Sequence, residues 1–125
     1  MTIQVQFANK VAEILKRDAS VIGLAVAGSW LTNEIDEFSD LDLIVVTKEK
    51  ITDDKAKMLV YANSFGNLLN GFTGEHVGEP RVLICLYDEP LLHVDIKFVT
   101  LDEFKVRVEN PSILLDTNEQ LKDVI

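Results

Sequence analysis

The sequence contains a single cysteine in 125 residues, Cys85, and this scarcity excludes an internal disulfide bond. Cys85 lies within the apolar run VLICLY, so we expect it to be a small core residue rather than a reactive thiol. A free, buried cysteine is typical of proteins kept in a reducing compartment. We therefore expect the protein to be cytoplasmic.

Long apolar runs are missing as well. No run approaches the roughly 20 residues that a helix needs to cross a bilayer, and the N-terminus lacks a signal-peptide pattern. We expect a soluble protein without a membrane partner.

Basic residues are few: the chain has 12 Lys and Arg against 21 Asp and Glu, a net charge of −9. Broad contact with a nucleic-acid backbone needs a basic surface, so we do not expect nucleic acid as a partner. The acidity is compatible with metal ions or a cationic partner. The alternative that it serves only for solubility stays open.

The length fits one domain, and neither an internal repeat nor a linker is visible. We expect residues 1–125 to form a single domain. Apolar periodicity predicts helices over residues 3–18 and 52–70, a helical turn over 101–105, and strands over 21–27, 40–47, 81–87, 91–100 and 112–116. This order predicts an α/β (α+β) fold, a mixed sheet of about four to five strands with helices packed on one face.

The second predicted helix is the longer one. Thr52 with Asp53 is expected to cap its start, and Gly71 and Gly74 are expected to end it after about Asn70. Its apolar stripe would consist of Met58, Leu59, Ala62, Phe65, Leu68 and Leu69.

Acidic side chains stand at unusual places in two predicted strands. Asp40 and Asp42 flank Leu41 at the head of an apolar strand, and alternation turns both aspartates to the same side. In LLHVDIKFVT, residues 91–100, the polar face carries His93, Asp95 and Lys97. If the two strands are neighbours, Asp40, Asp42 and Asp95 converge.

Three crowded carboxylates would repel one another unless a cation compensates their charge. Oxygen ligands on rigid strands suit Mg²⁺, which takes further ligands from water and from substrate phosphates. Zinc fits poorly, because the lone cysteine and the two histidines, His76 and His93, lack the spacing of a zinc site.

Gly28 and Ser29 follow the first predicted strand and suit a phosphate. A glycine there lets backbone N–H groups approach the anion, and the serine hydroxyl can donate to it. Taken alone, Gly-Ser could be an ordinary turn, Asp-x-Asp a cap or solvated edge, and His93 and Lys97 solvated strand residues. The ordered combination of phosphate-binding turn and metal-binding acids favours phosphoryl transfer.

These residues resemble the signature of the DNA polymerase beta-like nucleotidyltransferase superfamily: a strand ending in Gly-Ser, a loop of about ten residues, Asp-x-Asp on the next strand and a later acid. The stretch GSWLTNEIDEFSDLDLIVV is most similar to aminoglycoside- and lincosamide-type adenylyltransferases, as are VDIKFV and SILLD. The resemblance covers roughly residues 10–117. Trp30 stands where several relatives carry arginine.

The resemblance implies an enzyme that moves a nucleoside monophosphate, AMP from ATP, to a hydroxyl of a small-molecule acceptor. Gly28 and Ser29 would hold the β- and γ-phosphates, with Lys97 as a further phosphate contact. The two acids of Asp-Leu-Asp would bind one or two Mg²⁺ ions. Asp95 would complete the metal site and help activate the acceptor hydroxyl.

Larger relatives continue into a helical domain that shapes the acceptor pocket. The resemblance therefore implies one of two arrangements: either residues 1–125 are a core cut from a longer protein with a C-terminal helical domain, or a homodimer or a helical protein partner completes the pocket. It also leaves an alternative function: a minimal nucleotidyltransferase antitoxin-like or non-catalytic nucleotide-binding core that acts with a protein partner.

Overall fold

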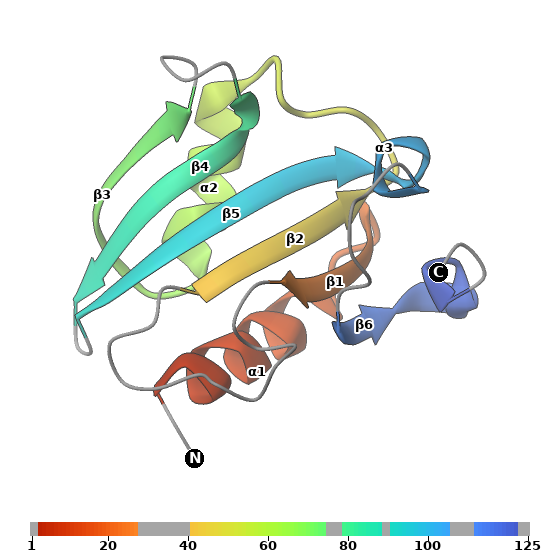
Figure 1. Ribbon diagram of the computed structural model, residues 1–125, viewed down its shortest axis with the longest axis horizontal. Coiled ribbons are helices and arrows are strands. Elements are labelled where there is room, and N and C mark those ends of the chain that lie inside the picture. Colours follow the sequence, from red (N-terminus) through yellow and green to blue (C-terminus); the bar gives the residue numbers. More distant parts are fainter. Residues whose placement is uncertain (1–2, 28–40, 75–78, 89–90, 106–111, 123–125) are drawn as a thin grey trace.

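The computed structural model describes residues 3–27, 41–74, 79–88, 91–105 and 112–122 (Figure 1). Six strands form one sheet in the order β3-β4-β5-β2-β1-β6. The strands are β1 (Val21–Ala27), β2 (Leu41–Thr47), β3 (Asn67–Gly74), β4 (Glu79–Asp88), β5 (Leu92–Thr100) and β6 (Ser112–Asp116). The helices are α1 (Ile3–Leu15), α2 (Lys55–Ser64), α3 (Leu101–Lys105) and the 3₁₀ turn η3 (Thr117–Glu119).

The sheet is mixed because its two central strands, β2 and β5, run parallel, whereas the other neighbouring strands run antiparallel. Parallel strands begin at the same edge of a sheet. The starts of β2 and β5 therefore meet there, and β1, antiparallel to β2, ends beside them. This edge brings together the three strands on which the sequence predicts a site.

The two long helices cover one face of the sheet, as predicted. Leu43 of β2 and Ile96 of β5 are buried there in a cluster to which α1 contributes Phe7 and Val11, and α2 contributes Met58. Alternate residues turn to the opposite side, which we call the second face of the sheet. A smaller apolar cluster lies around Val46, Val99, Phe104 of α3 and Leu121 after η3.

The prediction of a helix reaching Asn70 is wrong, because residues 67–74 form the edge strand β3. This strand raises the count to six, slightly above the four to five expected, and the mixed α+β fold is confirmed. Helix α2 ends at Ser64, with Phe65 as its C-cap. Glycine weakens a helix interior, whereas pairing with β4 satisfies the backbone along this segment. Leu68 packs on the core and Leu69 is 54% exposed, so the apolar stripe expected of a helix divides here.

Two helix boundaries also differ slightly from the prediction. Helix α1 ends at Leu15 rather than at residue 18. Helix α2 is capped by Asp54, not by the Thr52-Asp53 pair, because the Asp54 carboxylate accepts a hydrogen bond from the Lys57 amide at 3.1 Å. Among the helices of the described residues, none has the length and apolarity to cross a membrane.

Candidate active site

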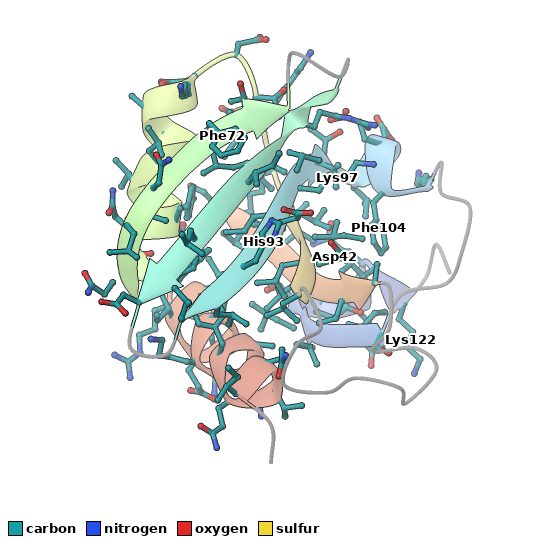
Figure 2. All side chains as sticks on the ribbon, turned by 60° about the vertical axis from the view of Figure 1, so that its left-hand side comes forward. Asp42, Phe72, His93, Lys97, Phe104 and Lys122 are labelled. Carbon is teal, nitrogen blue, oxygen red and sulfur yellow. The ribbon has the colours of Figure 1, made fainter. Side chains whose placement is uncertain are left out.

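Two of the predicted site residues, Asp42 and Asp95, lie side by side on the two central strands of the sheet. Strands β2 and β5 pair in a register that sets Asp42 opposite Asp95. Adjacent strands lie about 4.8 Å apart, and paired residues of parallel strands share a face. Both aspartates are half-buried between the inward-facing apolar residues of their strands. Figure 2 shows Asp42, His93 and Lys97 among the side chains of this part of the sheet.

The end of β1 adjoins this acid pair. Ala27, the last residue of β1, pairs with Asp42. The next two residues in the sequence are Gly28 and Ser29, the predicted phosphate contacts. Gly28, Ser29 and Asp40 lie outside the described residues, and their predicted roles stay predictions.

On the β4 side of the acid pair, apolar residues continue the row of paired residues toward the edge strand β3. Ile84 of β4 pairs with Asp95, and Phe72 of β3 pairs with Ile84. Phe72 is 44% exposed. Sequence reasoning missed this neighbour, because it assigned no strand to the segment that carries Phe72. The complete row of paired residues consists of Phe72, Ile84, Asp95, Asp42 and Ala27, the last residue of β1.

His93 contacts one of the two acids. Its Nε2 atom lies 2.8 Å from Oδ1 of Asp95, on the same face of β5. The side chains of His93 and Asp95 are 42% and 33% exposed, so solvent only partly covers the contact. A carboxylate oxygen accepts but does not donate, and Nε2 is therefore the donor. Residue alternation predicted the shared face but not the bond.

Lys97 lies on the same face of β5 as Asp95, two positions further along the strand and away from His93. It pairs with Ile44 of β2 on one side and Val82 of β4 on the other. The side chain is half-buried. Its position is compatible with a contact to a long anionic substrate on this face, which stays a prediction.

The acid pair suits a hard divalent cation. Carboxylates on adjacent strands repel each other when both are charged, and a cation between them removes that cost. The ligands are oxygens, as Mg²⁺ prefers. The described part of the chain contains no group of three or more potential metal ligands. Asp42 and Asp95 therefore stay predicted ligands, and the third member of the predicted set, Asp40, lies outside the described residues.

Cys85 plays no part in this site. It is buried on the helix-covered face of β4, and its thiol donates to the Leu83 carbonyl at 3.6 Å. Burial raises the pKa of Cys85 to about 12, so the thiol is a core group at neutral pH. This confirms the expectation for the lone cysteine.

A mixed sheet with two long helices on one face, and paired acids on its central parallel strands, is consistent with a polymerase beta-like nucleotidyltransferase core. Residues 8–117 match the profile of the nucleotidyltransferase domain family, and the chain belongs to that family. Membership supports nucleotidyl transfer as the general activity. No curated protein matches the chain.

Proposed function

We propose that the protein is a metal-dependent nucleotidyltransferase that moves AMP from ATP to a hydroxyl of a small-molecule acceptor. The observation that carries the proposal is the pairing of Asp42 with Asp95 beside the end of β1. An acid pair beside the end of the strand that, in the sequence, leads into Gly-Ser supports a cation site next to a phosphate site, the arrangement that phosphoryl transfer requires.

In this proposal each residue has a separate task. Gly28 and Ser29 bind the β- and γ-phosphates, and Lys97 neutralises part of the phosphate charge. Asp40, Asp42 and Asp95 hold Mg²⁺, which when bound neutralises charge on the phosphates and the leaving pyrophosphate.

Asp95 also orients the acceptor hydroxyl and takes up its proton. The acceptor oxygen then forms a bond to the α-phosphorus, and the bond from that phosphorus to pyrophosphate breaks. Catalysis rests mainly on position and charge, because this transfer needs no covalent intermediate on the protein.

The test is AMP transfer from α-labelled ATP in the presence of Mg²⁺, with a panel of hydroxyl acceptors that includes cationic ones. Asp42→Asn keeps the shape of the side chain and removes its charge, so we expect transfer to fall by at least about 100-fold. Asp102→Asn is the matched control, since Asp102 is 94% exposed on α3, and it should retain full activity. Equal activity of the two variants would contradict the proposal.

A second candidate function is a nucleotide-binding core that works with a protein partner. It is favoured by exposed apolar residues on the edge strand and its neighbour: Leu69, Phe72 and Leu86 are 54%, 44% and 40% exposed. Monomeric proteins generally limit such exposure. The mass of the purified protein by light scattering, and activity measured alone and after co-purification, separate the two. Full activity as a monomer would reject this alternative.

A further inference from the structure

We infer that His93 is a positioning residue for Asp95: its ring holds one carboxylate oxygen so that the other is presented to a divalent cation beside Asp42. The inference rests on the function proposed above and assigns a role to a residue outside the family's acid triad. It starts from the 2.8 Å contact between His93 Nε2 and Asp95 Oδ1.

His93 and Asp42 lie in different directions from Asp95. His93 precedes it by two positions on the same strand, so their hydrogen bond runs along β5. Asp42 lies across the sheet, on the neighbouring strand. When Oδ1 accepts from the ring, Oδ2 remains as the oxygen available to a cation held between the strands. The hydrogen bond thereby limits rotation of the Asp95 carboxylate, so that Oδ2 is the oxygen that faces the cation.

The ring has an apolar residue as its cross-strand neighbour. His93 pairs with Leu86 of β4, whose side chain lies on the same face of the sheet. An apolar neighbour lowers the local dielectric around a partly buried hydrogen bond, and this strengthens the bond. Outer partners that orient metal ligands typically change metal affinity by about 10- to 100-fold when removed. His93 has the contact and the location for such a partner.

The test measures metal binding rather than turnover. Free Mn²⁺ is quantified by electron paramagnetic resonance during titration of the purified chain, with Mn²⁺ alone and with a non-hydrolysable ATP analogue. His93→Phe keeps a ring of similar size without a donor, and we expect its Mn²⁺ dissociation constant to rise by about 10-fold. His93→Gln places an amide N–H near the position of Nε2 and should stay within about threefold of wild type.

His93→Asn provides a second loss variant, because its shorter side chain brings the amide nowhere near the position of Nε2. It should weaken Mn²⁺ binding as His93→Phe does. Since His93 is 42% exposed, all three variants should fold, which circular dichroism checks. Unchanged Mn²⁺ affinity in His93→Phe and His93→Asn would overturn the inference.

A double variant separates positioning from a direct effect of the ring. In an Asp95→Asn background, adding His93→Phe should change the dissociation constant by less than about twofold, because the oriented oxygen is already gone. A full 10-fold effect in that background would overturn the inference.

Failure of the proposed function looks different. If the wild type binds no Mn²⁺ in either titration, the function and the inference fall together. If the wild type binds Mn²⁺ and Asp95→Asn binds it measurably more weakly, while His93→Phe equals wild type, only the inference fails.

Discussion

Three ionisable side chains in the layer covered by the helices make this protein less stable at alkaline pH. Burial raises the pKa of Cys85 to about 12, and burial together with Asp18 raises the pKa of Tyr61 to about 12. Burial also raises the pKa of Tyr87, whose hydroxyl donates to the Ala62 carbonyl at 2.6 Å. In each case the folded state keeps its proton at a pH where the unfolded chain has lost it.

The sign of the pH effect follows from these directions. The pKa of a cysteine in the unfolded chain is 9.0 and that of a tyrosine is 10.0, both below the folded values. The stabilisation is therefore complete below about pH 9 and is lost as the pH rises toward 12. Between pH 8 and pH 11 we expect Cys85 alone to lower the free energy of unfolding by about 3 kcal/mol.

Urea unfolding at pH 8, 9, 10 and 11 measures this loss. Cys85→Ala is less stable throughout because it leaves a cavity, but its stability should fall less steeply with pH than that of the wild type. If the two curves run parallel, the buried thiol does not contribute to the alkaline transition.

At the scale of single elements, the N-terminus of α2 offers a matched pair of variants. Asp54 accepts from the Lys57 amide, whereas Asp53 precedes the cap. Asp54→Ala should cost about 1 kcal/mol of unfolding free energy, because a helix N–H loses its acceptor. Asp53→Ala should stay within about 0.5 kcal/mol of wild type. Urea unfolding at neutral pH compares them, and an inverted order would place the cap at Asp53.

Most elements could be predicted from local patterns, and β3 shows where such patterns stop. Leu68 and Leu69 continue the spacing of a helical stripe, so the segment reads as helix when taken alone. It forms a strand because β4 supplies hydrogen-bond partners, and β4 comes later in the sequence. Local propensity cannot contain that information.

The candidate site divides in the same way. Alternation in the sequence predicts which side chains of β2 and β5 share a polar face, and the burial of Leu41, Leu43 and Val94 agrees with it. The pairing of Asp42 with Asp95 could be stated only as a condition, because strand order depends on tertiary packing. The hydrogen bond from His93 to Asp95 could not be predicted from the sequence, since same-face spacing allows such a contact without requiring it.

At the scale of the whole molecule, Gly23 lies where three segments of the chain pack together, namely β1, β6 and the residues after η3. A Cβ atom there would lie 2.5 Å from the Leu115 carbonyl oxygen of β6 and 2.6 Å from Cδ2 of Leu121. Strand β1 therefore approaches β6 and the buried Leu121 so closely that only glycine fits. The packing of the C-terminal segment on the sheet depends on this absent side chain.

We expect Gly23→Ala to lower the free energy of unfolding by at least about 2 kcal/mol, because a backbone atom must move to admit the methyl group. Gly71→Ala is the control. Its Cβ would lie 3.1 Å from Cδ2 of Leu59, the end of a flexible side chain, so its effect should be less than about 1 kcal/mol. Thermal and urea unfolding report both, and a mild effect at Gly23 would mean that β6 shifts easily.

The parallel pairing of β2 with β5 has a consequence for how the protein comes to work. Asp42 and Asp95 are far apart along the chain, and α2, β3 and β4 all intervene between them. Closing such a large loop is slow relative to forming a helix or a hairpin. The acids would therefore meet late during folding, and nascent or partly denatured chains would retain helical signal while lacking affinity for divalent ions.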